Sequence, residues 1–169
     1  MNAAIRYFTR SKKGNTKKLA DAVSAAIGIE AIDVTVDLPE KVDRLFLINA
    51  MYAANIDKEV KEFLERNKDK IGEVVNMNTA ATGSSTWKAV KKETEKLGIK
   101  LSEKEFHCAA SWIFINKGLP SDEDYIKAIC DILGDYDRFA NEALKTSVMF
   151  DAQKVTQEIV EDIRQLIEK

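Results

Sequence analysis

A polar loop near the N-terminus, residues 11–16 (Ser-Lys-Lys-Gly-Asn-Thr), carries residue types that can bind an anion. It follows an apolar segment and precedes an amphipathic one, which is typical of a turn from a strand into a helix. The hydroxyl groups of Ser11 and Thr16 and the backbone N–H groups around Gly14 can converge on an anion, with the positive end of the helix dipole behind them. We expect Gly14 to let the backbone approach that anion, because it has no side chain. The two lysines add positive charge, so the loop is predicted to hold a phosphate group.

The loop differs from the two common nucleotide-binding motifs. It lacks the G-x-x-x-x-G-K-[ST] pattern of P-loops and the G-x-G-x-x-G pattern of dinucleotide-binding turns. An ordinary strand–helix turn, capped by Asn15 or Thr16, is the alternative interpretation of the same residues.

Short apolar runs alternate with amphipathic segments around this loop and beyond it. The predicted strands are 3–8, 31–36, 44–49, 73–78 and 105–112. Apolar residues at spacings of three and four predict helices that begin near Asn15, Asp57, Ser84 and Ser121. Strands that alternate with helices predict a parallel sheet with helices on its faces.

Glycines support these helix ends, because a chain often leaves a helix through a left-handed residue. The glycines expected just after the four helices are Gly28, Gly72, Gly98 and Gly134. Ser121 and Asp124 form a plausible capping pair for the fourth helix.

Two segments depart from regular alternation. Residues 36–43, between the second and third strands, are fewer than the dozen or so that a crossover helix needs. We therefore expect a short or absent helix there. Residues 135–169 form a C-terminal extension that ends in an amphipathic helix. That helix either packs on the sheet or serves as a dimerisation helix or a cover over the site; residues 1–169 are taken as a single domain.

The composition excludes several classes of protein. A net charge of −2, from 26 basic and 28 acidic residues, argues against nucleic-acid binding. One histidine and two cysteines without ligand spacing argue against a metal site. No apolar run approaches the length of a membrane span, so a cytoplasmic protein without membrane contact is expected. His107, Cys108 and Cys130 are interpreted as structural residues.

The loop in this setting resembles the phosphate loop of the flavodoxin family, whose pattern is [ST]-x-[ST]-G-x-T with an alanine four residues after the threonine. The matching positions are Ser11, Gly14, Thr16, Ala20 and Val23. Lys13 replaces the middle hydroxyl residue, and Thr9 stands where an aromatic residue is common. The resemblance extends over about residues 3–134 and excludes the C-terminal extension.

This resemblance implies a flavodoxin-like three-layer α/β sandwich with a five-stranded parallel sheet of order 2-1-3-4-5. In such sheets a ligand binds at the carboxyl ends of the strands, here between the first and third. It also implies an FMN-binding redox protein, either an electron carrier or a small flavin-dependent reductase. The partner would be a redox protein or a small-molecule electron acceptor. The flavin supplies the chemistry, so no catalytic side chain is assigned.

Two later loops are similar to the flavin-binding loops of that family. Residues 49–55 carry Tyr52 among small residues, and Tyr52 could stack on the flavin ring; the alternative is a half-exposed loop aromatic. Residues 79–85 could donate backbone hydrogen bonds to the ring edge, or their hydroxyl-rich helix start could form a second anion site. Nearby Trp87 is interpreted as a core residue rather than a ring-stacking one.

The cofactor-binding residues that follow from the resemblance lie in these three loops. They are Ser11, Lys12, Lys13, Gly14, Asn15, Thr16, Ala50, Met51, Tyr52, Ala53, Thr79, Ala80, Ala81, Thr82 and Gly83.

The competing hypothesis is a binding or regulatory module of the same fold that has lost flavin. The substitutions at Thr9 and Lys13 and the missing crossover helix favour it. A response-regulator receiver is disfavoured because Phe8-Thr9-Arg10 stands where its acidic pair would follow the first strand. A hydrolase is disfavoured because the single histidine has no evident nucleophile beside it.

Overall fold

The computed structural model describes residues 2–11, 14–111, 116–121, 124–125 and 127–128. Most of the predicted fourth helix, Gly134 and the extension 135–169 therefore lie outside the described residues. The elements in chain order are β1 (Ala3–Tyr7), α1 (Asn15–Ile27), β2 (Ala31–Asp33), β3 (Val42–Ala50), α2 (Lys58–Asn67), a 3-10 turn (Lys68–Lys70), β4 (Ile71–Ala80), α3 (Trp87–Leu97) and β5 (Lys100–Ala109).

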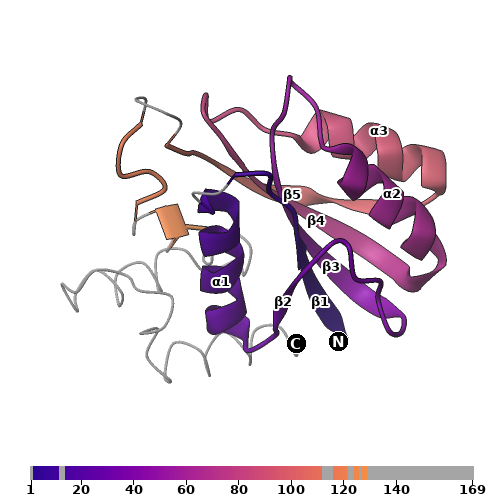
Figure 1. The fold of residues 1–169 in the computed structure, drawn as a ribbon. Helices are drawn as coiled ribbons and strands as arrows, with labels where there is room; N and C mark the ends of the chain where they lie inside the picture. The colour runs from indigo at the N-terminus through magenta and orange to yellow at the C-terminus, as the bar shows by residue number, and fades with distance from the viewer. Residues whose placement is uncertain (1, 12–13, 112–115, 122–123, 126, 129–169) are drawn as a thin grey trace.

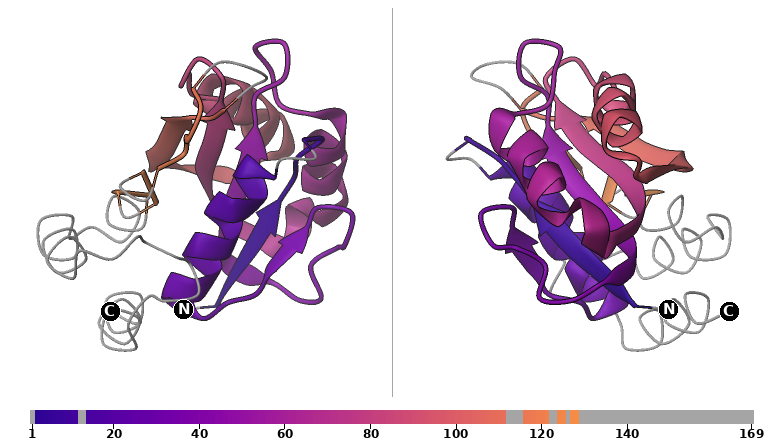
Figure 2. Two further views of the ribbon diagram at one scale, coloured as in Figure 1. Left: turned by 60° about the vertical axis from the view of Figure 1, so that its left-hand side comes forward. Right: turned by 90° about the vertical axis from the view of Figure 1, so that its right-hand side faces the viewer.

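The five strands form one parallel sheet of order β2-β1-β3-β4-β5, which confirms the predicted order. Helix α1 lies on one face of the sheet, and α2 and α3 lie on the other (Figure 1; Figure 2). The result is a three-layer α/β sandwich. Within the part that the structure describes, no helix is long and apolar enough to cross a membrane.

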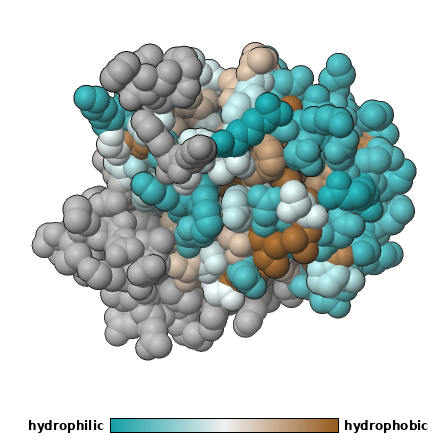
Figure 3. Space-filling model, in the orientation of Figure 1, coloured by the Kyte–Doolittle hydropathy of each residue, from teal (hydrophilic) through white to brown (hydrophobic). Residues whose placement is uncertain are grey.

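The hydrophobic core has two halves, one on each face of the sheet, because successive strand residues point to opposite faces. Phe46 and Met77 pack against α1 through Leu19. Leu45 belongs to the other half, with Phe63 of α2. The outer surfaces of α2 and α3 are mostly hydrophilic (Figure 3), as expected for amphipathic helices that cover a sheet.

A loop without a helix connects β2 to β3, as predicted. Arg6, a residue only 3% exposed, holds this loop by donating from its guanidinium group to the carbonyl oxygens of Val36 at 3.1 Å and Asp37 at 3.2 Å. From α2, Asn67 accepts a hydrogen bond from the backbone N–H of Leu38 at 2.9 Å. Hydrogen bonds from buried side chains therefore hold this connection in place where a crossover helix is missing.

Several predicted boundaries were wrong. β2 ends at Asp33, whose carboxylate accepts a hydrogen bond from the Thr35 N–H at 2.9 Å and so starts a turn. β5 runs from Lys100 to Ala109 rather than from 105 to 112, and α3 begins at Trp87 rather than near Ser84.

Gly28 and Gly98 end α1 and α3 in the left-handed conformation, as predicted. Gly72 does not follow a helix in this way: it lies inside β4. A Cβ there would come 2.6 Å from the carbonyl oxygen of Asp43, so the close approach of β4 to the start of β3 requires this glycine.

Candidate functional site

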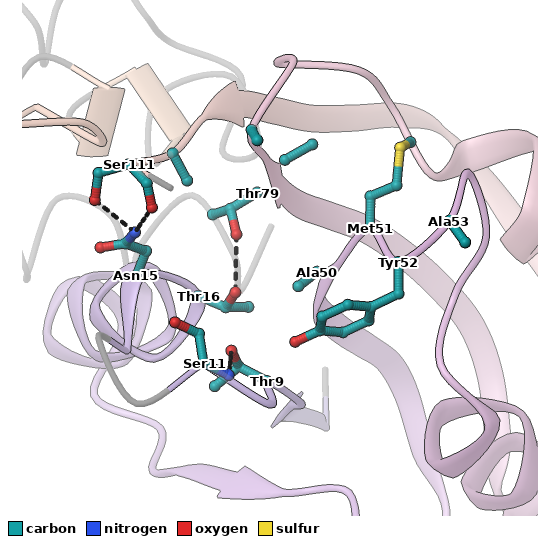
Figure 4. Close-up of a pocket in the computed structure, with 13 residues that line it drawn as sticks. Thr9, Ser11, Asn15, Thr16, Ala50, Met51, Tyr52, Ala53, Thr79 and Ser111 are labelled. Atoms are coloured by element: carbon teal, nitrogen blue, oxygen red, sulfur yellow. Dashed lines mark hydrogen bonds between the residues drawn. The ribbon is translucent and has the colours of Figure 1, made fainter. Parts of the chain in front are cut away.

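A cavity of about 340 Å³ opens at the carboxyl ends of the strands, within the size range of small-molecule sites (Figure 4). It lies beside β1 and β3, where the chain order of the sheet reverses direction. Its lining residues are Thr9, Ser11, Asn15, Thr16, Ala50, Met51, Tyr52, Ala53, Thr79, Ala80, Ala81, Ala110 and Ser111. None of them is charged, so the cavity suits a ligand with a large uncharged part.

Hydroxyl groups gather at one end of the cavity. The Oγ1 atoms of Thr16 and Thr79 lie 2.8 Å apart and both residues are almost fully buried. The pair uses one of its two hydroxyl protons between its own oxygens, which leaves the other to donate to a ligand. The N-terminus of α1 starts at the same place, and no acidic residue lies in its first turn. Its dipole therefore favours a negative charge here.

Gly14 is required in this turn for its backbone conformation. Its φ is +69°, and among the described residues a Cβ would meet only the Cβ of Lys17, at 4.0 Å. Its N–H donates to the carbonyl oxygen of Ser11 at 3.1 Å, which closes the turn before α1. The left-handed conformation therefore disfavours a side chain at this position.

Asn15 joins this end of the cavity to the chain after β5. Its Nδ2 donates to the carbonyl oxygen and to the Oγ of Ser111, each at 3.0 Å (Figure 4). Ser111, Ala110 and Thr9 line the cavity but are absent from the predicted site. The signal for Thr9 was available, because it follows the predicted first strand at the edge that carries the site. Ala110 and Ser111 were missed because the predicted fifth strand ran to residue 112, whereas β5 ends at Ala109.

Tyr52 forms the opposite end of the cavity and is bound to the first loop. Its hydroxyl oxygen accepts a hydrogen bond from the backbone N–H of Arg10 at 2.6 Å. The guanidinium carbon of Arg10 lies 5.4 Å from the centre of the Tyr52 ring, a cation–π contact. Arg10 Nε also lies 2.6 Å from Oδ2 of Asp57, whose side chain is 1% exposed. That contact is an ion pair whose angles fall outside those of a hydrogen bond.

A tight turn follows Tyr52. The backbone N–H and carbonyl groups of Tyr52 and Asn55 exchange two hydrogen bonds of 2.9 Å. Between them, Ala53 and Ala54 have φ values of 48° and 59°. Two consecutive alanines in the left-handed region place this turn under backbone strain.

Side chains of the sheet hold the loop after β4. Asn78 donates from Nδ2 to the carbonyl oxygen of Ser84 and accepts from the N–H of Thr86, both at 2.9 Å. Ser85 donates from its hydroxyl to the carboxylate of Glu105. A carboxylate beside the start of α3 repels a negative charge, so the alternative of a second anion site there loses its support.

The structure gives His107 and Trp87 hydrogen-bond partners in the backbone and buries Cys108. His107 Nδ1 lies 2.8 Å from the carbonyl oxygen of Gly83. Trp87 lines a separate hollow between α3 and β5, and its indole N–H donates to the carbonyl oxygen of Ser102 at 3.1 Å. Burial raises the pKa of the Cys108 thiol to about 12, so it stays protonated and unreactive.

Most of the predicted cofactor-binding residues come together around the cavity. Lys12 and Lys13 lie outside the described residues, and Gly14, Thr82 and Gly83 do not line the cavity. The assignment of these residues to a cofactor stays a prediction. Within the described ranges there is no cluster of side chains that could hold a metal ion.

The similarity to known proteins lies in the structure. No protein-family profile matches the sequence, and no curated protein sequence matches it. A flavodoxin from the domain Archaea is 15% identical, and the match covers 88% of this chain and all (100%) of that one with a TM-score of 0.60. A short-chain flavodoxin associated with a bacterial microcompartment is 15% identical over 88% of this chain and 100% of its own, with a TM-score of 0.54. Flavodoxin 2 from Bacillus cereus is 14% identical over 84% of this chain and 99% of its own, with a TM-score of 0.54.

These matches extend over nearly the whole length of three flavodoxins, and they agree with the α/β architecture and the sheet order of this chain. The chain therefore has a flavodoxin-like fold.

Proposed function

We propose that this protein binds FMN and acts as a flavodoxin-like redox protein. The observation that carries the proposal is the cavity, which has no charged residue in its lining and has two unlike ends, the hydroxyl groups and helix start at one and the Tyr52 ring at the other. FMN has the matching design, with a phosphate group joined by a polyol chain to a flat ring. The matches to flavodoxins support the same ligand.

The residues present fit this group. Ser11, Thr16 and the first N–H groups of α1 would hold the phosphate, because they offer donors and a positive dipole. Tyr52 and the small residues Ala50 and Ala81 would flank the ring. Bound flavin supplies one- or two-electron transfer, and the chain's own residues bind and orient it.

The test is a titration of the apoprotein with FMN and with riboflavin, followed by flavin fluorescence and absorbance. We expect both to bind, FMN more tightly. Thr16→Val should weaken FMN binding about tenfold or more, because it removes a hydroxyl from a charged acceptor, and should change riboflavin binding little. Thr94→Val is the matched control, since Thr94 is also fully buried but lies on α3 and bonds to Lys91.

The second candidate function is a binding or regulatory module that has lost flavin. The Thr16–Thr79 and Asn15–Ser111 hydrogen bonds favour it, because they already engage polar groups that a cofactor would use. Colourless protein that gains no thermal stability from excess FMN would support the module and refute the leading proposal.

Two finer parts of the proposal need their own measurements. Transfer to a redox partner protein and reduction of a small-molecule acceptor both fit the cavity, and the turnover of reduced FMN-loaded protein with quinones separates them. Light scattering of the full chain and of a chain lacking residues 135–169 tests the homodimer predicted for the C-terminal helix.

A further inference from the structure

We propose that Tyr52 and Arg10 couple the two ends of the cavity, so that an anion at the hydroxyl end favours binding of an aromatic ring at the Tyr52 end. The identity of the ring and the anion rests on the proposed function. The coupling itself concerns the two loops and can be measured without FMN.

The link is a hydrogen bond between residues of different loops. The Arg10 N–H that donates to the Tyr52 hydroxyl belongs to the residue directly before Ser11, which lines the anion end. The Ser11 N–H in turn donates to the Thr9 hydroxyl at 3.1 Å. An anion that orders this short stretch therefore also fixes the direction of the Arg10 N–H, and with it the position of the Tyr52 ring.

Ile56, at the end of the loop that carries Tyr52, is buried in the core, but the tip of the loop before Ile56 depends on the bond between Arg10 and Tyr52. Its turn is strained at Ala53 and Ala54, and both residues are exposed. Among the described residues, its one backbone bond to the sheet runs from the Met51 N–H to the Thr79 carbonyl oxygen, at 3.2 Å. A loop with few contacts to the rest of the protein loses conformational entropy when a ligand binds to it. A contact that already orders the loop before the ligand binds reduces this loss.

The Arg10 side chain adds further contacts to the hydrogen bond between its backbone N–H and Tyr52. Its guanidinium lies over the Tyr52 ring and pairs with the buried carboxylate of Asp57. Asp57 also accepts a hydrogen bond from the Glu59 N–H at 3.1 Å at the start of α2. Arg10 thus joins the anion loop, the Tyr52 ring and the first turn of α2, and we assign it and Tyr52 as positioning residues.

The experiment measures riboflavin affinity of the apoprotein with and without inorganic phosphate, with ionic strength held constant by chloride. We expect phosphate to lower the riboflavin Kd about fivefold or more, and riboflavin to lower the phosphate Kd by the same factor. Tyr52→Phe should bring this factor close to one, because it removes the acceptor of the Arg10 N–H. Arg10→Ala keeps that N–H and should reduce the factor less.

Matched controls separate coupling from general damage. Tyr7→Phe alters a tyrosine that also lies beneath a cation, Lys17, and Lys91→Ala removes a cation from the ring of Trp87. Both should keep the wild-type factor. A factor near one in the wild type, or one that Tyr52→Phe leaves unchanged, would overturn the coupling.

A second readout needs no flavin. Hydrogen exchange of the amides of residues 51–55 should slow when phosphate is added to the wild type and to Tyr7→Phe, but not to Tyr52→Phe. The absence of this protection in the wild type, or its persistence in Tyr52→Phe, refutes the inference. Failure of FMN to bind while phosphate still protects this loop would refute the proposed function alone.

Discussion

The two loops that flank the cavity, residues 51–56 after β3 and residues 81–86 after β4, are held by different means. The first has a strained turn and is fastened mainly to a neighbouring loop through Tyr52 and Arg10. The second is fastened to the sheet beneath it through Asn78 and Glu105. The difference suggests that the first loop adapts to a ligand whereas the second provides a fixed wall.

The cause lies in the buried amides at the ends of the central strands. Asn49, Asn76 and Asn78 are all 0% exposed and share the face of the sheet covered by α2 and α3. Asn76 accepts from Asn49 at 2.9 Å and from the Thr86 hydroxyl at 3.2 Å. Side chains of this network reach the loop after β4, and in the described residues none of its hydrogen bonds reaches residues 51–56.

Asn78→Ala tests the fixed loop and should have the largest effect. It leaves the Thr86 N–H and the Ser84 carbonyl oxygen without their partners, so we expect a loss of about 3 kcal/mol in the free energy of unfolding. Urea denaturation measures it. The control is Asn55→Ala in the other loop, where the side chain serves only the Ile56 N–H and a loss of about 0.5 kcal/mol is expected. Equal losses in the two variants would contradict the distinction between the loops.

Most helix starts could be predicted because they depend on local patterns, whereas the sheet order was predicted from the resemblance to the flavodoxin family. Gly28 and Gly98 mark helix ends, and Ser121 with Asp124 forms the expected reciprocal capping bonds of 2.7–3.3 Å. The last two residues of β4, Thr79 and Ala80, were missed because Thr79 looks like a loop residue, although it pairs with Ala50 of β3 and Cys108 of β5. Hydropathy alone does not distinguish a polar residue with buried partners from a solvated one.

The site could be predicted as a set of loops but not as a set of contacts. The rule that parallel strands carry their ligand at the carboxyl edge located Ser11, Tyr52 and Thr79 together. The bond between Arg10 and Tyr52 joins residues 42 positions apart, and no local pattern indicates it. Arg10 was therefore absent from the predicted residues, and its role became visible only in three dimensions.

Asp57→Ala tests the anchorage of the adaptable loop and should have an intermediate effect. It removes the side-chain cap of α2 and the partner of Arg10, so we expect a loss of about 1.5 kcal/mol in unfolding free energy. Asp57→Asn keeps an acceptor for the cap and should cost less. Hydrogen exchange should also quicken at residues 51–56 and stay unchanged at 81–86. Faster exchange in both loops would mean that they share one support.

Ala54→Gly should have the smallest effect and the opposite sign. An alanine in the left-handed region costs roughly 1–2 kcal/mol, and a glycine there loses about 0.4–1 kcal/mol through its more flexible unfolded state. The difference between these two effects predicts that Ala54→Gly raises the free energy of unfolding by about 0.5 kcal/mol. This is measured as a small rise in the midpoint of urea denaturation. Ala81→Gly is the control in the fixed loop, because Ala81 is not among the residues with positive φ. This variant should lose about as much free energy of unfolding as Ala54→Gly gains. A loss at both positions would show that the turn after Tyr52 is not strained and that its freedom to adapt has another origin.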